Sequence, residues 1–128
     1  MYLVDTDVLI WVLRGKREIV EKLSALKEES PLSISVISIA EIYKNIFPSE
    51  LTTTEDYLNQ HLILEVDQKI AKLAGLYWQQ YSKRLKNLTL TDCLIAGTAN
   101  MNNLTLLSLN VKHFPMEDIR ILDPLSSK

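Results

Sequence analysis

The sequence predicts an α/β domain built on a mostly parallel, five-stranded sheet. Five short apolar runs alternate with stretches of helical periodicity along the chain. This alternation favours a parallel sheet, because parallel neighbours are joined by crossover helices. The chain has 128 residues, of which 47% are hydrophobic and 23% charged, as in an ordinary globular protein with a single core. We therefore expect one domain over residues 1–124 and a short tail over 125–128.

The first half of the chain contains two strand–helix units. An apolar run ends at Asp5, and the stretch that follows fits a buried helix with Thr6 or Asp7 as its cap. Further on, apolar residues recur at helical spacing until Pro31. The predicted elements are strands at 2–4 and 32–37 and helices at 8–13, 18–29 and 39–47.

The second half repeats this rhythm. A long stretch from Gln68 keeps apolar residues in helical register, and the turn Asn102-Asn103 ends the next such stretch. The predicted helices are 54–61, 68–85 and 91–100, and the predicted strands are 62–66, 104–109 and 119–122.

Composition excludes several classes of protein. Cys93 is the only cysteine, so the chain forms no internal disulfide or cysteine zinc site, which favours a reducing, cytoplasmic location. The net charge of −2 excludes a generally basic nucleic-acid coat protein but leaves room for a local basic strip. Acidic residues interrupt the apolar N-terminus, so we expect neither a membrane span nor an export signal there.

Short polar side chains follow several of the predicted strands. Asp5 ends the first strand, Glu41 lies one turn into the helix after the second, and Asn110 ends the fourth. Asp92 lies in the first turn of the helix at 91–100, and Asp7 is a fifth candidate. Ligands of open α/β sheets bind beyond the carboxyl ends of the strands, so these side chains are expected to share one rim.

Each acid also has a purely structural interpretation. The stretches 38–41 and 89–92 have the pattern of a capping box, and Asp5 or Asp7 suits a helix cap. Convergence of several acids is harder to explain by capping, because clustered carboxylates repel one another and raise one another's pKa. A divalent cation removes this repulsion, and an all-oxygen ligand set favours Mg²⁺ or Mn²⁺ over zinc.

Four segments carry a resemblance to a known family. YLVDTDVLIW, SVISIAEIYKNI, LTLTDCLIAGTA and LTLLSLNVKHFP occur in the expected order over nearly the whole chain. The sequence resembles the PIN-domain endoribonucleases, and most closely the VapC toxins of toxin–antitoxin pairs. This resemblance implies a three-layer sandwich and an Mg²⁺- or Mn²⁺-dependent ribonuclease. It also implies that Asp5, Glu41 and Asp92 are the acidic metal-site residues, while Asn110 stands where many PIN domains carry a fourth acid.

The expected reaction is metal-assisted hydrolysis of an RNA phosphodiester, in which the cation polarises the phosphate and activates water. Asp5 and Asp92 are expected to be the principal ligands, with Glu41 binding directly or through water and Asp7 and Asn110 as secondary groups. The resemblance implies products with a 5′-phosphate and a 3′-hydroxyl. It also implies a cognate antitoxin that covers the site, and a homodimer.

Candidate substrate-binding residues flank the acids. Thr6 and Thr91 can hold water or phosphate, and each is equally suited to capping. Arg84 and Lys86 precede Asp92 and are candidate phosphate contacts, although cations are also favoured at helix ends. Lys44 lies one turn past Glu41 and can contact the substrate or pair with an acid. We interpret Trp11 and Cys93 as packing residues.

Two other functions remain open at this point. Asn110, in place of an acid, is compatible with a catalytically silent PIN module that binds nucleic acid or a protein. A receiver-like phospho-acceptor domain also needs an acidic pair, which Asp5 and Asp7 imitate. It further needs a lysine after the last strand, and Ile121-Leu122-Asp123-Pro124 offers none.

Overall fold

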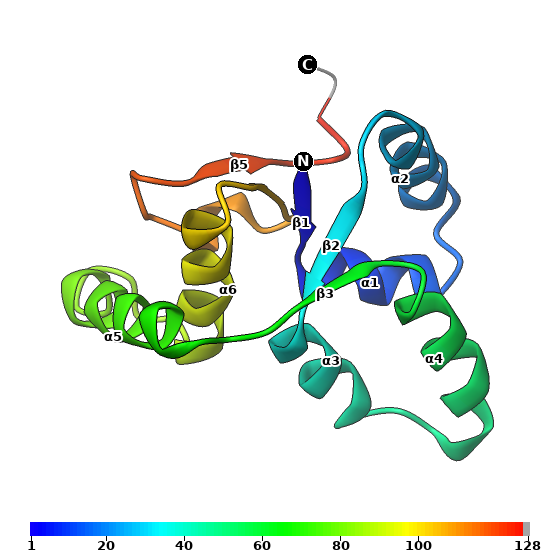
Figure 1. The fold of residues 1–128 in the computed structure, drawn as a ribbon, viewed down its shortest axis with the longest axis horizontal. Coiled ribbons are helices and arrows are strands. Elements are labelled where there is room, and N and C mark those ends of the chain that lie inside the picture. Colours follow the sequence, from blue (N-terminus) through cyan, green and yellow to red (C-terminus); the bar gives the residue numbers. More distant parts are fainter. Residues whose placement is uncertain (127–128) are drawn as a thin grey trace.

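Five parallel strands form one sheet in the structure, a computed structural model that describes residues 1–126 (Figure 1). The strand order is β3-β2-β1-β4-β5, and every neighbouring pair is parallel. The predicted α/β class is therefore confirmed. The strands are Tyr2–Val4 (β1), Leu32–Ser35 (β2), Leu62–Leu64 (β3), Thr105–Leu107 (β4) and Arg120–Leu122 (β5).

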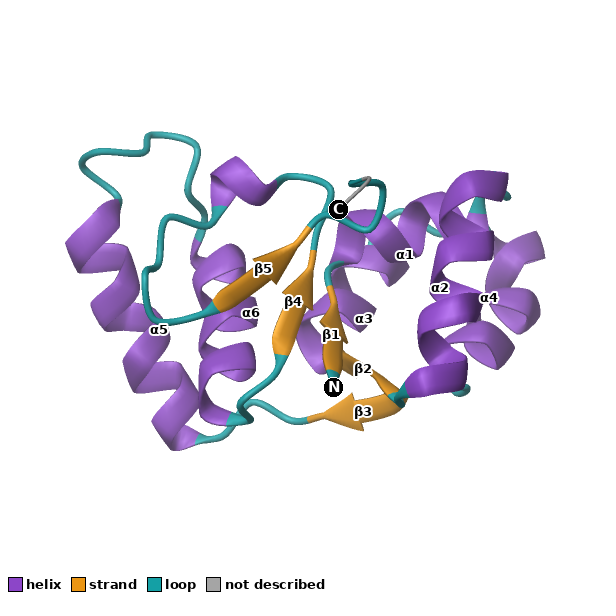
Figure 2. Ribbon diagram, turned by 90° about the horizontal axis from the view of Figure 1, so that it is seen from above, coloured by secondary structure: helices purple, strands orange, loops and turns teal. Residues whose placement is uncertain are grey.

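Helices cover both faces of the sheet, which gives the expected three layers (Figure 2). One face packs against α1 (Thr6–Leu13), α2 (Arg17–Glu29) and α4 (Leu51–Leu58). The other packs against α5 (Gln68–Tyr81) and α6 (Leu90–Met101). The helix α3 (Val36–Tyr43) follows β2 directly, and two single 3₁₀ turns, η1 (Pro48–Glu50) and η2 (Val111–His113), complete the described elements.

Two apolar clusters fill the space between the layers. Side chains alternate across a strand, so Leu3 and Leu106 join the cluster under α5 and α6 while Val4 and Leu107 join the cluster under α1 and α2. All four are fully buried, and burial of each such side chain contributes about 1.5–3 kcal/mol. Because both faces are covered, β1 is a continuous apolar run, and β2 buries the small residues Ser33 and Ser35 between its apolar ones.

Two helix starts differ from the prediction because of the residues that cap them. The second strand ends at Ser35, because the Ser35 hydroxyl accepts the Ile37 N–H at 3.0 Å and caps α3. The helix predicted from residue 39 therefore begins at Val36. The cap of α1 is Asp5, whose side chain accepts the Thr6 N–H at 2.8 Å. The capping interpretation of Asp5 is therefore confirmed, and Thr6 and Asp7 are not the cap.

Several ends also differ by a few residues. The helix predicted at 68–85 ends at Tyr81, and the one predicted at 54–61 spans Leu51–Leu58. The fourth strand ends at Leu107, so Asn110 follows the sheet by three residues instead of ending it. A local hydrogen bond explains why the strand ends before Asn110. The Ser108 hydroxyl accepts the Asn110 N–H at 3.0 Å, and this bond turns the chain away from β4.

The end of the described chain is tied to the domain. Pro124 is fully buried, and the Leu125 N–H donates to Asp123 Oδ1 at 2.8 Å. Residues 127 and 128 of the predicted tail lie outside the described residues, and the domain boundary at 124 stays a prediction. No helix within residues 1–126 has the length and apolar character needed to cross a membrane.

Candidate active site

The strand order places a switch point beside β1. The chain passes from β1 to β2 on one side and later returns through β4 on the other. The Asp5 N–H donates to the Leu107 carbonyl at 2.9 Å, so the ends of these two strands are joined. Open α/β sheets bind ligands in the crevice outside such a point. Residues that follow β1 and β4 are therefore in the position where chemistry is expected.

Asp5 is held by both of its carboxylate oxygens. Oδ1 accepts the Thr6 N–H at 2.8 Å, and Oδ2 accepts the Ser108 hydroxyl at 2.9 Å. The residue is only 7% exposed. Burial, followed by the charge of Asp7, raises the pKa of Asp5 from 3.8 to about 8. The structure thus keeps an acidic group where its negative charge is costly without a cation.

Asp7 lies beside Asp5 and is half-buried. Its Oδ2 accepts the Asn110 side-chain amide at 2.7 Å. Among the described residues, Asp7 Oδ1 is buried and has no hydrogen-bond partner. Burial raises the pKa of Asp7, and the backbone of Leu109 and of Val8, followed by the Asn110 amide, opposes this effect. An orphaned carboxylate oxygen beside a second carboxylate is suited to a positively charged ligand.

Glu41 reaches the same rim from α3 through Thr6. The Thr6 hydroxyl donates to Glu41 Oε1 at 2.6 Å and lies 2.9 Å from the Ser38 hydroxyl. Thr6 is buried and Ser38 fully so, which fixes the orientation of the Glu41 carboxylate. Ser38 does not cap α3, so the capping box predicted at 38–41 is wrong. Glu41 is therefore not part of a cap of α3, and its role in a metal site stays a prediction.

Asp92 takes part in the capping box predicted at 89–92. The Thr89 hydroxyl accepts the Asp92 N–H at 3.1 Å, and Asp92 Oδ2 accepts the Thr89 N–H at 3.3 Å. The charge of Asp92 nevertheless acts on the site, since it contributes to the raised pKa of Asp5. Within residues 1–126, no three His, Cys, Asp or Glu side chains stand close enough to hold one ion together. The sharing of an ion by Asp5, Glu41 and Asp92 stays a prediction.

The donor set at the rim fits a hard dication. All the groups offer oxygen atoms as metal ligands. One of these oxygens, Asp7 Oδ1, is buried without a hydrogen-bond partner. The negative charges of Asp7 and Asp92 add to burial in raising the pKa of Asp5. Mg²⁺ and Mn²⁺ prefer such ligands, whereas zinc prefers His and Cys. Cys93 is fully buried, and burial raises the pKa of its thiol to about 11, which disfavours metal binding there.

The predicted substrate-binding residues differ in their surroundings. Arg84 and Lys86 are exposed in the loop between α5 and α6, and the Arg84 guanidinium lies 5.1 Å from the Tyr81 ring centre. Lys44 is exposed at the end of α3. The Thr91 hydroxyl lies 3.0 Å from that of Thr89. The Thr6 hydroxyl donates to Glu41 and orients this acid, and its contact with water or phosphate stays a prediction.

Sequence reasoning missed Ser108. This fully buried hydroxyl joins the Asp5 carboxylate to the backbone of Asn110, and so it ties the acid after β1 to the loop after β4. Its signal was a polar residue at the end of an otherwise apolar strand. The spacing between Ser38 and Glu41 matches a capping box and predicts a helix cap at Ser38. In the structure, Ser38 is instead buried against Thr6.

The raised pKa of Asp5 predicts a pH effect on stability. Between about pH 4 and pH 8, the folded metal-free protein binds a proton that the unfolded chain has released. The free energy of unfolding in EDTA should therefore fall as pH rises through this window, by at most about 1.4 kcal/mol per pH unit for each such proton. Denaturant unfolding at a series of pH values measures this slope. Asp5→Asn should flatten it, and an equal slope in both proteins would contradict the assignment.

The structure thus places acidic side chains at the switch point of a parallel α/β sheet. A family model identifies the class of domain, because the PIN domain model matches residues 2–115. The chain belongs to the PIN-domain family. The prediction from the four sequence segments is thereby confirmed.

Named relatives agree with this assignment. The chain is 37% identical over 116 residues to ribonuclease VapC10 of Mycobacterium tuberculosis, which covers 91% of this chain and 87% of that protein. It is 31% identical over 119 residues to ribonuclease VapC2 of Haemophilus influenzae, covering 88% and 89% of the two chains. The resemblance to VapC proteins is thus also confirmed.

Solved structures share the fold. A toxin–antitoxin complex from Klebsiella pneumoniae contains a chain with a TM-score of 0.77 and 28% identity, covering 97% of this chain and 98% of that one. DNA-bound VapBC from Salmonella typhimurium gives a TM-score of 0.81 at 24% identity, covering 96% and 97%. The three-layer arrangement is therefore shared with chains of these two complexes.

Proposed function

We propose that this protein is an Mg²⁺- or Mn²⁺-dependent endoribonuclease, the toxin of a toxin–antitoxin pair. The proposal rests on one observation: the carboxylates of Asp5 and Asp7 lie side by side at the switch point of the sheet in a PIN domain. A buried acid with a pKa raised to about 8 and an orphaned oxygen beside it are costly unless a ligand uses them. The relatives named as ribonucleases supply the reaction class.

Asp5 and Asp92 are proposed as the principal metal ligands, with Glu41 direct or through water and Asp7 and Asn110 in support. A bound dication would neutralise the carboxylates and polarise the phosphodiester. Ser108 keeps Asp5 in one orientation through its 2.9 Å hydrogen bond. Thr6 does the same for Glu41 at 2.6 Å. Such supporting hydrogen bonds reduce the cost of organising the site when the substrate arrives.

Exposed cations are the proposed phosphate contacts. Arg84 and Lys86 lie in the loop that leads into α6, and Lys44 directly follows α3, the helix that carries Glu41. Contacts of this kind supply affinity for RNA without reading its sequence. They also offset the repulsion between an acidic site and a polyanion. Thr91, half-buried beside Asp92, is a further candidate for holding phosphate or water.

We further propose a cognate antitoxin, a homodimer and a cytoplasmic location. The relatives of known structure include chains in toxin–antitoxin complexes, which supports an inhibitory protein partner. An intracellular RNA substrate and a buried, unpaired Cys93 support a reducing compartment.

Cleavage of structured RNA by the purified protein tests the proposal. We expect cutting with Mg²⁺ or Mn²⁺, no cutting in EDTA, and products that carry a 5′-phosphate. Folded protein that binds RNA but leaves it intact with either metal would contradict the enzyme and favour the silent PIN module.

A further inference from the structure

Asp7 and Asn110 join the start of α1 to the loop after β4. The Asn110 side-chain amide donates to Asp7 Oδ2 at 2.7 Å, although the two residues are 103 positions apart in the chain. The Asn110 N–H is itself held by the Ser108 hydroxyl at 3.0 Å, and Ser108 donates to Asp5 Oδ2 at 2.9 Å. The loop after β4 therefore holds both carboxylates at the start of α1.

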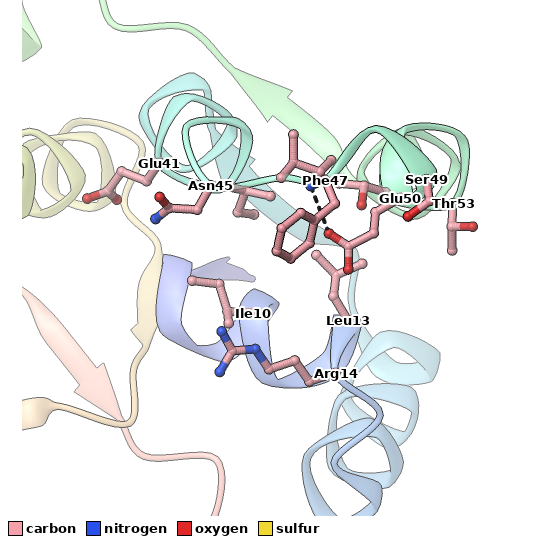
Figure 3. Close-up of a pocket in the computed structure, with 12 residues that line it drawn as sticks. Ile10, Leu13, Arg14, Glu41, Asn45, Phe47, Ser49, Glu50 and Thr53 are labelled. Carbon is pink, nitrogen blue, oxygen red and sulfur yellow. Dashed lines mark hydrogen bonds between the residues drawn. The ribbon is translucent and has the colours of Figure 1, made fainter.

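Asp7 differs from the other acids of the rim in the state of its oxygens. Both Asp5 oxygens accept hydrogen bonds, and Thr6 donates to Glu41 Oε1 at 2.6 Å. Figure 3 shows Glu41 on α3, at the end of a pocket of about 350 Å³, with its carboxylate directed away from the other residues that line this pocket. Asp7 Oδ1 is the one buried side-chain nitrogen or oxygen within residues 1–126 that has no hydrogen-bond partner. Asp7 therefore carries the oxygen that gains most from a bound cation.

The fold itself has no use for this oxygen. Asp5 caps α1, so Asp7 is not needed as a cap. The helix dipole attracts a carboxylate in the first turn, but this attraction is weaker than the cost of leaving a buried carboxylate oxygen unpaired. Burial and then the charge of Asp7 raise the pKa of the Asp5 carboxyl, so the two acids also repel each other. A bound cation removes both costs.

Asn110 has the chemistry of a support for Asp7. Its amide donates to Asp7 Oδ2 and is neutral, so it holds the carboxylate without adding repulsion. An acid at position 110 would instead place a second negative charge against Asp7. Carboxylates that bind cations are commonly held by a hydrogen-bonding group of this kind. The contact thus occupies one oxygen of Asp7 and leaves the other for a ligand.

We propose that Asp7 Oδ1 binds the cation directly, beside Asp5, and that Asn110 is a positioning residue that acts only by holding Asp7. The inference rests on the proposed metal-dependent function, and it raises Asp7 from a supporting group to a principal ligand. The missing acid at position 110 is then supplied from α1. Asn110 consequently no longer favours a catalytically silent module.

Calorimetric titration of Mn²⁺ without RNA, above pH 8 where the Asp5 carboxyl is ionised, tests both roles apart from cleavage. Asp7→Asn should weaken Mn²⁺ binding about tenfold or more, because a charged ligand is lost, and Asn110→Ala should weaken it by about tenfold. In the Asp7→Asn background, Asn110→Ala should have no further effect, since a group that acts through Asp7 then has no ligand to hold.

Thermal denaturation in EDTA at the same pH separates a ligand from a structural acid. We expect Asp7→Asn to unfold at or above the temperature of the wild type, because a neutral side chain no longer repels Asp5. With saturating Mn²⁺ the order should reverse, since the wild type gains more from the ion. A purely structural Asp7 predicts a lower unfolding temperature in EDTA and an unchanged Mn²⁺ affinity, and this result would overturn the inference.

Matched controls come from the amino end of β5, at the opposite end of the strands from the acids. There Asp118 Oδ1 accepts the Tyr77 hydroxyl at 2.7 Å, and the Asn100 amide donates to the Asp118 carbonyl at 3.2 Å. Asp118→Asn and Asn100→Ala should therefore leave Mn²⁺ affinity unchanged.

The outcomes distinguish this inference from the proposed function. If Asp7→Asn binds Mn²⁺ like the wild type while Asp5→Asn does not, Asp7 is no ligand and the metal site stands without it. If Asn110→Ala weakens binding equally in both backgrounds, Asn110 acts independently of Asp7 and its positioning role is overturned. If Asp7→Asn loses Mn²⁺ affinity but the wild type cuts no RNA, the inference stands and the ribonuclease is wrong.

Discussion

Asp5→Asn is expected to reduce RNA cleavage about a thousandfold or more. Asparagine keeps the size of the side chain and the acceptor for the Thr6 N–H, but it removes the charge that binds the cation. Loss of metal-assisted stabilisation of several kcal/mol corresponds to this factor in rate. Initial rates on a fluorescent RNA with Mg²⁺ measure the effect.

The same variant is expected to fold at least as well as the wild type. Asparagine is as good an N-cap as aspartate, and it is neutral, so folding no longer requires a proton to be taken up by a carboxyl whose pKa burial raises to about 8. Asp67→Asn is the matched control, because Asp67 also caps a helix, accepting the Ile70 N–H at 2.8 Å. It should keep full activity. Undiminished cleavage by Asp5→Asn would remove Asp5 from the metal site.

Asp92→Asn is expected to lose activity by a similar factor. The capping interpretation and the metal interpretation of Asp92 predict opposite results. As a cap alone, Asp92 contributes about 1 kcal/mol or less to stability through Thr89, and asparagine preserves most of this contribution. As a metal ligand, it is needed for cleavage whatever its contribution to stability.

Paired measurements of unfolding and cleavage decide between these interpretations. We expect Asp92→Asn to unfold within about 1 kcal/mol of the wild type and to be almost inactive. Thr89→Ala is the companion variant, since it removes the cap and leaves the acid in place. It should be less stable and remain active. Loss of stability with full activity in Asp92→Asn would leave Asp92 as a cap only.

Much of the fold could be predicted from local patterns. Apolar-rich runs flanked by proline, aspartate or asparagine located all five strands, because a sheet covered on both faces is built from apolar-rich segments. Element ends were less predictable. Ser35 ends β2 by capping α3, and a hydroxyl in an apolar run gives no sign in the sequence of whether it continues the strand or caps a helix. Tyr81 ends α5 four residues before the apolar periodicity does.

The site could be predicted in part. The position of Asp5 at the end of a strand and of Asp92 in a first helical turn followed from the sequence. The contacts between segments did not, because they depend on strand order. Ser108 meets Asp5, and Thr6 meets Glu41, only once β4 lies beside β1 and α3 packs on α1. The predicted packing role of Trp11 is wrong, since this side chain is 39% exposed. Periodicity alone does not say which face of a short helix is covered.

Calorimetric titration of Mn²⁺ into the metal-free protein above pH 8 tests the central claim most directly, because the Asp5 carboxyl is then ionised. We predict saturable binding by the wild type and by Asp67→Asn, and binding at least about tenfold weaker in Asp5→Asn and Asp92→Asn. A folded wild-type sample that takes up no Mn²⁺ at millimolar concentration would contradict the proposal that these acids hold a cation.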